Sequence, residues 1–223
     1  MLALQLCRPT TVAVREVFER LFARHGVPKA IQCDNGEPFV SVRSRGGLSQ
    51  LSAWWMSLGI RLVHSRPGCP QDNGGHERMH ADIAADRQTH PALTRDAQQR
   101  ELDRWRQEFN HVRPHDALAG KTPADVYKPA ERRKPVARPF PYPPGVTAVR
   151  VNRGGSFVWC GSLYFLSASL QGQHVGIQPI DLLHVRVWYR DLDLSTLEIL
   201  PAVSDNAYLS ALTTRRKTKT RAA

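Results

Sequence analysis

The stretch Ile31-Gln32-Cys33-Asp34-Asn35-Gly36 predicts an apolar strand that delivers an aspartate onto a glycine-containing turn. A second stretch, Pro70-Gln71-Asp72-Asn73-Gly74-Gly75-His76-Glu77-Arg78-Met79-His80, predicts a polar loop that delivers Glu77 onto the first turn of a helix. Two carboxylates from separate elements can converge in a fold. Mg²⁺ prefers hard oxygen ligands and usually keeps water and substrate phosphate in its remaining positions. Asp34 and Glu77 are therefore candidate ligands of a divalent metal ion.

Outward from these stretches, the apolar periodicity predicts alternating helices and strands. The Pro9-Thr10-Thr11 segment favours a helix start, and Gly26-Val27-Pro28 favours its end. We expect strands at residues 1–6, 30–33 and 61–65, and helices at residues 12–25, 48–58, 76 to about 89, and 94–110. The aromatic residues of these helices have the spacing of core residues: Trp54, Trp55, Trp105 and Phe109.

The composition changes at residues 128–145, where closely spaced prolines and arginines exclude a helix or a central strand and predict a linker. Beyond it, six strand-like runs separated by Gly, Asn or Asp are typical of a small antiparallel barrel: residues 146–151, 156–159, 163–166, 174–179, 185–189 and 194–200. The expected organisation is an α/β domain at 1–127, this linker, an all-β module at 146–203 and a basic disordered tail at 204–223.

The net charge of +11 and the pI of about 10.1 indicate a protein that attracts polyanions, of which nucleic acid is the commonest inside cells. A hydrophobic content of 41% is enough for a buried core. The sequence has no apolar run long enough to span a membrane and no signal peptide at Met1–Cys7, so we expect a cytoplasmic protein without a membrane partner. Its four cysteines form no Cys-x-x-Cys pair, which argues against a disulfide framework or a structural zinc site.

His76-Glu77-Arg78-Met79-His80 also matches the His-Glu-x-x-His signature of zinc proteases, with Glu77 as the general base. That chemistry needs a third zinc ligand. Ile83 and Asp86 stand where the extended form of the signature requires glycine and histidine. The extended form of the signature is therefore absent, and a zinc protease is kept only as a rival interpretation of this segment.

A longer ordered set of residues resembles a known family. After Asp34-Asn35-Gly36 and Asn73-Gly74…Glu77 come Phe109-Asn110, Arg113-Pro114-His115, Leu118, Thr122-Pro123-Ala124 and Tyr127. Together they resemble the integrase catalytic core of bacterial insertion-sequence transposases, the group related to retroviral integrases. The resemblance runs from about Val27 to Tyr127.

The resemblance implies an RNase H-like fold in which two aspartates and a glutamate hold two Mg²⁺ or Mn²⁺ ions. Asp34 matches the second aspartate and Glu77 the glutamate. The first aspartate should lie on an earlier strand, but the residues before Asp34 contain only Glu16 and Glu19 as acids, both in a predicted helix. We therefore expect a partial RNase H-like core that lacks its first strands.

The same resemblance implies DNA as the partner, both as element ends and as target, and a homo-oligomer when the protein is complete. Residues suited to contacting DNA are Arg66, Asn73, Arg78, Arg113 and His115, since guanidinium groups bind phosphate without much sequence preference. Asn73 also suits a role in shaping the loop. The expected reaction is metal-dependent cleavage and strand transfer in DNA integration and transposition. The alternative is a DNA-binding transposase remnant without catalysis.

Overall fold

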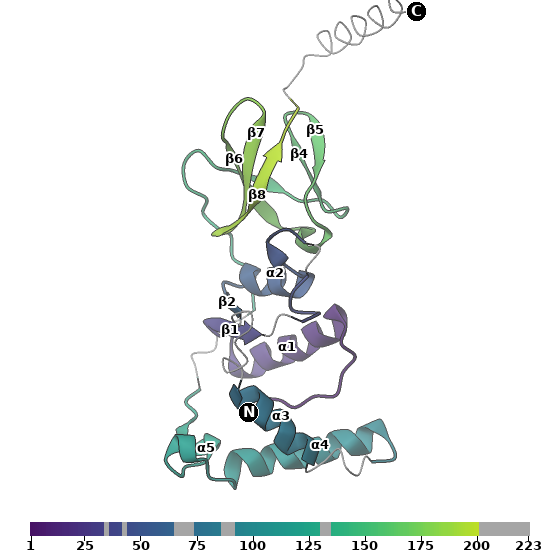
Figure 1. Cartoon of the computed structure of the whole chain (residues 1–223), viewed down its shortest axis with the longest axis vertical. Helices are drawn as coiled ribbons and strands as arrows, with labels where there is room; N and C mark the ends of the chain where they lie inside the picture. Colours follow the sequence, from purple (N-terminus) through teal and green to yellow (C-terminus); the bar gives the residue numbers. More distant parts are fainter. Residues whose placement is uncertain (34–35, 42–43, 65–73, 86–91, 130–134, 201–223) are drawn as a thin grey trace, which may run out of the picture. The chain divides into compact units, whose positions relative to one another are not determined.

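The computed structural model of the 223-residue chain describes residues 1–33, 36–41, 44–64, 74–85, 92–129 and 135–200 (Figure 1). The chain divides into two compact units. Unit 1 contains residues 1–41 and 48–139, and unit 2 contains residues 42–47 and 140–223. The mixture of helices and strands makes the chain an α/β protein, as its sequence predicts.

Two parallel strands form the sheet in the described part of unit 1: β1 (Ala30–Cys33) and β2 (Arg61–His64). Ala30 pairs with Arg61 at one end, and Cys33 pairs with His64 at the other. Both strands agree with the sequence-based prediction. Because parallel strands run in the same direction, the chain leaves both of them at the same edge of the sheet.

The core beside this sheet is built by α1 (Thr11–His25) and α2 (Gln50–Ser57). Trp55 is fully buried; the Phe18 ring meets it edge-on at a centroid distance of 4.7 Å, and the Phe39 ring stacks on it at 5.8 Å. Such aromatic pairs add to the stabilisation from burying apolar surface. The prediction that Trp54 and Trp55 belong to the core is confirmed.

Local capping explains where these two helices begin. The Thr10 hydroxyl accepts a hydrogen bond from the backbone N–H of Ala13, and Gly26 follows the last residue of α1 with a φ of 84°. At α2, Ser49 and Ser52 form a reciprocal capping box. These contacts satisfy backbone groups that the first helical turn leaves free, so the starts are encoded by adjacent residues.

A second apolar cluster of unit 1 lies between α3 (Gly74–Ile83) and α4 (Arg95–His111). Ile83, Leu102 and Trp105 are buried, with Phe109 packed against them. This confirms the predicted helix at 94–110 and the core position of Trp105. The expected continuation of α3 to Thr89 lies outside the described residues.

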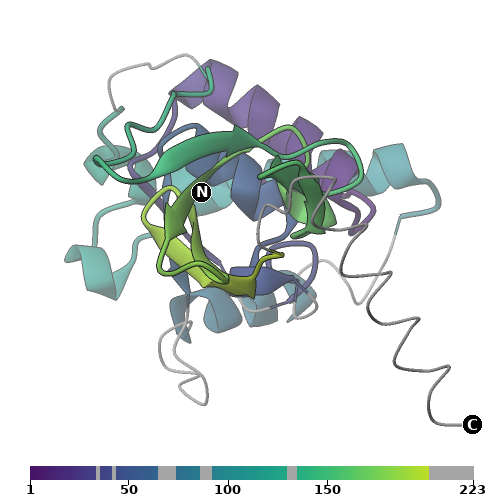
Figure 2. The same cartoon turned by 90° about the horizontal axis from the view of Figure 1, so that it is seen from above.

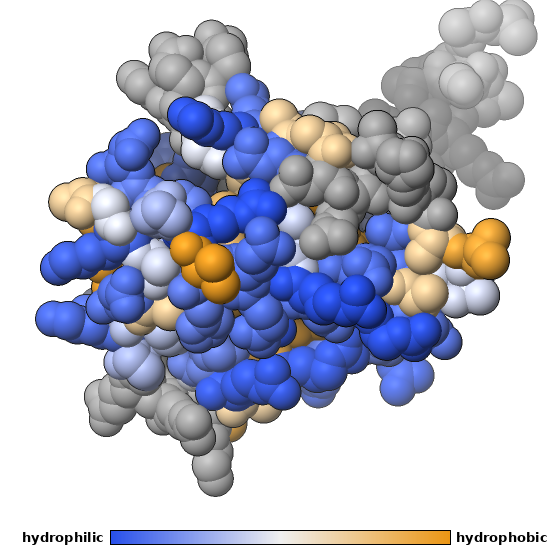
Figure 3. Space-filling view, turned by 90° about the horizontal axis from the view of Figure 1, so that it is seen from below, coloured by the Kyte–Doolittle hydropathy of each residue, from blue (hydrophilic) through white to orange (hydrophobic). Residues whose placement is uncertain are grey.

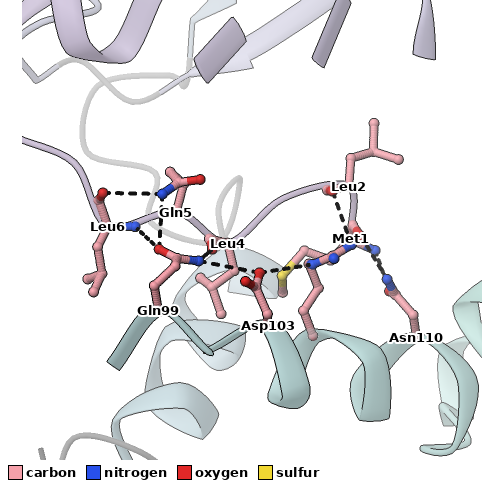
Figure 4. Close-up of polar contacts among 9 residues, drawn as sticks. Met1, Leu2, Leu4, Gln5, Leu6, Gln99, Asp103 and Asn110 are labelled. Atoms are coloured by element: carbon pink, nitrogen blue, oxygen red, sulfur yellow. Dashed lines mark hydrogen bonds and ion pairs between the residues drawn. The ribbon is translucent and has the colours of Figure 1, made fainter. Parts of the chain in front are cut away.

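The N-terminal residues Met1–Leu6 are not a strand, contrary to the prediction from their apolar run. They lie in extended form along α4, whose polar side chains bind their backbone (Figure 4). Asn110 accepts from the Met1 α-amino group at 2.6 Å and donates to the Met1 carbonyl at 2.7 Å. Gln99 donates to the Leu4 carbonyl and accepts from the Leu6 amide, each at 2.9 Å. Side chains therefore satisfy backbone groups that a neighbouring strand would otherwise bind.

After α4 the chain turns through a short 3-10 helix, η4 (Asp116–Leu118), into α5 (Pro123–Val126). The Asp125 carboxylate accepts hydrogen bonds from the backbone N–H and the hydroxyl of Thr122, at 2.9 and 2.8 Å. These bonds lower the pKa of Asp125 below its ordinary value. Pro123 occupies the first helical turn, where its missing N–H costs nothing.

Unit 2 contains six described strands in two sheets (Figure 2). One sheet has the order β3-β6-β7-β8 and is antiparallel throughout. The other is the β4–β5 hairpin. The bounds are β3 Thr147–Arg150, β4 Ser156–Trp159, β5 Ser162–Phe165, β6 His174–Pro179, β7 His184–Tyr189 and β8 Leu192–Glu198, with a 3-10 helix, η5 (Ala168–Leu170), between β5 and β6.

These strands agree with the six predicted runs to within about two residues at each end, but the described residues do not show the closed barrel that the pattern predicts. The core of unit 2 is formed by buried apolar residues that alternate along β6 and β7, including Val175, Ile177, Val185 and Val187. The predicted tail at 204–223 lies outside the described residues.

Tyr142, within the proline-rich stretch, is part of unit 2. Its hydroxyl donates to the carbonyl of His174 and accepts from the amide of Arg190, at 3.2 and 3.0 Å. Its ring covers Gly176, where a Cβ atom would come within 2.5 Å of the ring. The stretch after Pro139 is thus packed against the sheet.

Within the described ranges, none of the helices has both the length and the apolar character required to cross a bilayer.

Candidate metal and nucleic-acid site

The candidate site is organised by the parallel pair of strands in unit 1. Asp34 follows directly on Cys33, the last residue of β1. The chain after β2 runs through residues 65–73 into α3, which carries Glu77. Asp34, Arg66 and Asn73 themselves lie outside the described residues. β1 and β2 end at the same edge of the sheet, and from this edge the chain continues to Asp34 after β1 and to residues 65–73 after β2.

Glu77 lies in the first turn of α3, as its sequence predicts, and its side chain is exposed. An acidic side chain in this position is favoured by the positive end of the helix dipole. Arg78 is also exposed on the same turn. A carboxylate and a guanidinium are thus both accessible to a ligand at the start of α3.

Two glycines precede these residues on the helix. A Cβ atom added to Gly74 or Gly75 would meet no heavy atom within 4 Å. The backbone at the start of α3 is therefore approachable from solvent, and helix N-termini with free N–H groups favour anions. Such a helix start suits a phosphate group near Glu77.

Arg113 is held at the end of α4. Its guanidinium lies over the ring of Trp105, 5.4 Å from the centroid, and its Nη2 lies 3.2 Å from the carboxylate of Glu108. About a third of the Arg113 side chain is exposed. A phosphate that approaches Arg113 would share it with Glu108, which weakens the attraction.

His115 is anchored by the same helix. Its ring meets the Phe109 ring edge-on at a centroid distance of 4.6 Å, and its Nε2 atom is buried without a hydrogen-bond partner among the residues that the structure describes. Its backbone bonds Lys121 and Gly120, which closes the turn after α4. The sequence identified Arg113 and His115 as polar candidates and Trp105 and Phe109 as core, but not that the two aromatic rings hold the two polar side chains.

His76 and His80 would be the two histidine ligands in the zinc-protease alternative. His80 is exposed on α3, and the side chain of His76 lies outside the described part of the chain. Among the described residues, no three His, Cys, Asp or Glu side chains are grouped as metal ligands. Because Asp34 is not among them, this finding does not bear on the carboxylate pair.

Comparison with known proteins shows which family part of this chain is similar to. Residues 58–123 match the family described as "Integrase core domain". This stretch begins just before β2 and ends at the start of α5, so it includes Glu77, Arg78, Arg113 and His115. The chain carries an integrase core domain. Asp34 lies before the matched residues.

A curated relative connects the integrase core domain with mobile elements. The chain is 27% identical over 122 residues to the "Insertion element IS476 uncharacterized 39.2 kDa protein" of Xanthomonas euvesicatoria. The alignment covers 54% of this chain and 33% of that protein, so the chain spans about a third of the length of the relative. The chain is thus similar both to an integrase core domain and to a protein of an insertion element.

Proposed function

We propose that the chain acts in DNA integration and transposition, as part of a metal-dependent enzyme that cleaves and joins phosphodiester bonds. One observation carries the proposal: in a chain with an integrase core, the segments that bear Asp34 and Glu77 leave the same edge of a parallel strand pair. Divalent ions bound there would activate a water or a 3′-hydroxyl and stabilise the leaving oxygen.

The donor set suits that metal. Asp34 and Glu77 offer carboxylate oxygens, which are the ligands that Mg²⁺ and Mn²⁺ prefer, and Glu77 is exposed at the start of α3. Two ions, as the family implies, need a further carboxylate. Residues 1–33 contain only Glu16 and Glu19, both on α1, and Glu19 pairs with Arg15 at 2.9 Å. We propose that this chain supplies two of the three ligands and forms a partial RNase H-like core.

In this proposal the basic residues hold the DNA backbone beside the carboxylates. Arg78 is the strongest candidate for direct phosphate contact, because it is exposed and adjacent to Glu77. Arg66 and Asn73 lie on the connecting loop. Arg113 would contact phosphate from its position on Trp105, and His115 would support that contact by closing the turn.

The proposal extends to the partners. Element ends and target DNA would be bound, and the complete protein would act as a homo-oligomer. The net charge of +11 supports binding to a polyanion. The face of unit 1 that carries α4 is dominated by hydrophilic side chains with scattered apolar ones (Figure 3).

Mn²⁺ affinity measured by titration calorimetry tests the proposal. Asp34→Asn and Glu77→Gln should each weaken Mn²⁺ binding at least tenfold, since each removes one charged ligand. Glu101→Gln is the matched control, because Glu101 lies on α4 in an ion pair with Arg104 at 2.8 Å. Equal affinity in all four proteins would overturn the assignment of the site.

A non-catalytic DNA-binding protein is the second candidate. It is favoured by the sequence before Asp34, where Glu16 and Glu19 are the only acidic residues. Both candidates predict DNA binding, but only the first predicts that Asp34→Asn changes Mn²⁺ affinity. The integrase match, which covers His76–His80, favours both of them over a zinc protease.

A further inference from the structure

One side of α1 lies outside the core of unit 1. Val14 and Phe22 are buried in that core, with Phe18 packed against them. Beside this core stripe, four residues recur at the i, i+3, i+4 and i+7 spacing that places side chains on one side of a helix. They are Val17, Arg20, Leu21 and Arg24. Both arginines are exposed and both apolar residues are partly buried, so α1 has a second, amphipathic side.

The second side of α1 borders a cavity of about 610 Å³ within unit 1. Its four residues line the cavity together with residues 2–5 and with Asp103 and Arg106 of α4. Figure 4 shows Asp103 beside the N-terminal segment. Arg20 and Arg24 are exposed, so the cavity is open to solvent along α1. We call this cavity the arginine groove. Its volume accepts a ligand much larger than a single phosphate ion.

The side chains that line the arginine groove carry a positive charge, because Arg20, Arg24 and Arg106 face a single acidic residue, Asp103. In the part of the chain that the structure describes, neither Arg20 nor Arg24 forms an ion pair. The Arg106 Nε lies 3.9 Å from the Asp103 carboxylate, at the outer limit of an ion pair, and its Nη1 donates to the Leu2 carbonyl at 3.4 Å. The groove therefore offers guanidinium groups that an anion can bind.

The lining suits phosphate groups that are linked by less polar units. Guanidinium groups bind phosphate through two parallel N–H···O bonds and impose little sequence preference. Arg20 and Arg24 are one helical turn apart, about 6 Å along the axis, so they can contact different phosphates. Leu4, Val17 and Leu21 add apolar surface to the groove. A small free anion would leave this surface in water, whereas the sugars of a nucleic-acid strand would cover it.

We propose that the arginine groove is a second DNA-binding surface of unit 1, in which Arg20, Arg24 and Arg106 hold the sugar–phosphate backbone. The inference rests on the proposed function, from which it takes DNA as the ligand. It adds a different place of contact, since Arg78 and Arg113 are not among the described residues that line the groove. The net charge of +11 adds a general attraction for the same ligand.

The test measures the affinity of the whole chain for a labelled DNA duplex by fluorescence anisotropy, in EDTA so that no divalent metal contributes. Arg20→Gln and Arg24→Gln should each weaken binding by about fivefold to tenfold near 0.1 M salt, and each should reduce the log–log salt slope by about 0.9, because each removes one phosphate contact. Glutamine and arginine have similar helix propensities, so α1 should stay folded in both variants.

Arg104→Gln is the matched control. It removes the same charge from the chain, but Arg104 pairs with Glu101 at 2.8 Å, has a side chain that is 71% exposed, and does not line the groove. It should change neither the affinity nor the slope appreciably. Equal weakening in Arg104→Gln and Arg20→Gln would overturn the inference, because net charge alone would then explain the binding.

Asp103→Asn tests the sign of the effect. It removes the carboxylate from the groove and should strengthen DNA binding by about threefold or more, since a like charge no longer repels the phosphates. A purely structural role of Asp103 predicts no gain in affinity. Unchanged or weaker binding in this variant, with the chain still folded by circular dichroism, would contradict the inference.

Tripolyphosphate, titrated by calorimetry, separates DNA from a free polyphosphate as the source of the phosphate groups. Tripolyphosphate binding that is lost in Arg20→Gln, with DNA affinity unchanged, would overturn the inference in favour of a small-anion site. Absence of DNA binding by the unmodified chain would overturn it as well. DNA binding that depends on Arg20 and Arg24, together with Mn²⁺ affinity that Asp34→Asn leaves unchanged, would instead contradict the proposed metal site while the groove stands.

Discussion

The ring of His115 packs edge-on against the ring of Phe109, with the two centroids 4.6 Å apart. Phe109 in turn stacks on Trp105, with 5.1 Å between the two ring centroids. The guanidinium of Arg113 lies over the Trp105 ring. Two polar residues from the integrase pattern are therefore held by two core residues of α4. The position of the turn after α4 depends on this packing rather than on local hydrogen bonds alone.

Phe109→Ala should lower the free energy of unfolding of unit 1 by about 3 kcal/mol, because it removes a partly buried ring and leaves a cavity beside Trp105. Urea denaturation followed by tryptophan fluorescence measures the change. Val112→Ala is the control, since Val112 is exposed and its truncation should cost little. An equal effect of the two substitutions would contradict the packing described for α4.

Gly155→Ala should destabilise unit 2 severely. Gly155 has a φ of 80°, and a Cβ atom there would lie 2.6–2.7 Å from backbone atoms of Ser167 and Ala168, which cannot move aside as a side chain can. Gly161 also has a positive φ, 79°, but a Cβ atom there would meet nothing within 4 Å. Gly161→Ala should therefore lower the free energy of unfolding by only about 1 kcal/mol. Thermal melts of the two variants separate the cost of the positive φ, which both share, from the cost of the steric clash, which only Gly155→Ala has. Similar melting temperatures would refute the close approach at Gly155.

Alkaline pH should destabilise unit 2 through Tyr189. Burial raises the pKa of Tyr189 well above its ordinary value of 10.0, and burial also raises the pKa of Tyr142. A raised pKa in the folded state means that the stabilisation is fully present below pH 10 and is lost as the pH rises beyond it. Denaturation at a series of pH values measures this loss. In Tyr189→Phe the free energy of unfolding should fall less steeply at alkaline pH. This variant also loses the hydrogen bond from the Tyr189 hydroxyl to the Gln173 Oε1.

DNA affinity should fall steeply with salt, with a log–log slope of roughly −0.9 for each phosphate neutralised on a duplex. Truncation after Leu212 removes Arg215, Arg216, Lys217, Lys219 and Arg221 and should flatten that slope without changing sequence preference. Fluorescence anisotropy at several salt concentrations gives the affinity and its salt dependence.

Replacing His76 and His80 by Ala should leave the DNA affinity nearly intact. Stoichiometric zinc that is present in the unmodified protein and lost in this variant would favour the protease alternative.

If the chain supplies two of three metal-binding carboxylates, as we propose, it should show no strand transfer by itself, because loss of one ligand of a cooperative metal site removes most of the rate. The assay joins labelled DNA ends to a target in the presence of Mg²⁺ or Mn²⁺. Joining by the purified chain that disappears in Asp34→Ala would contradict this expectation and show that the third carboxylate is supplied in another way.

Much of the secondary structure was predictable because its signals are local. Thr10 and Gly26 mark the ends of α1, and short-range turn residues separate the strands of unit 2. The matched integrase segment likewise follows from residues between β2 and α5, and Glu77 lies in the first helical turn as expected. The candidate site was predictable only as a set of side chains, because the way in which separate elements bring those side chains together depends on long-range packing.

By itself, the sequence determined most of the helices and strands, because caps, turns and periodicity act between neighbouring residues. The pairing of Asp34 with Glu77 stays a prediction. Only the tertiary structure decided the place of Met1–Leu6, whose apolar run fits a strand equally well but whose backbone is bound by Gln99 and Asn110 of α4. The same holds for Ser44 and Arg45, whose partners in unit 2 lie 123 to 150 residues further along the chain. Contacts over such separations leave no periodic signal in the sequence, since they depend on which surfaces meet after the local elements have formed.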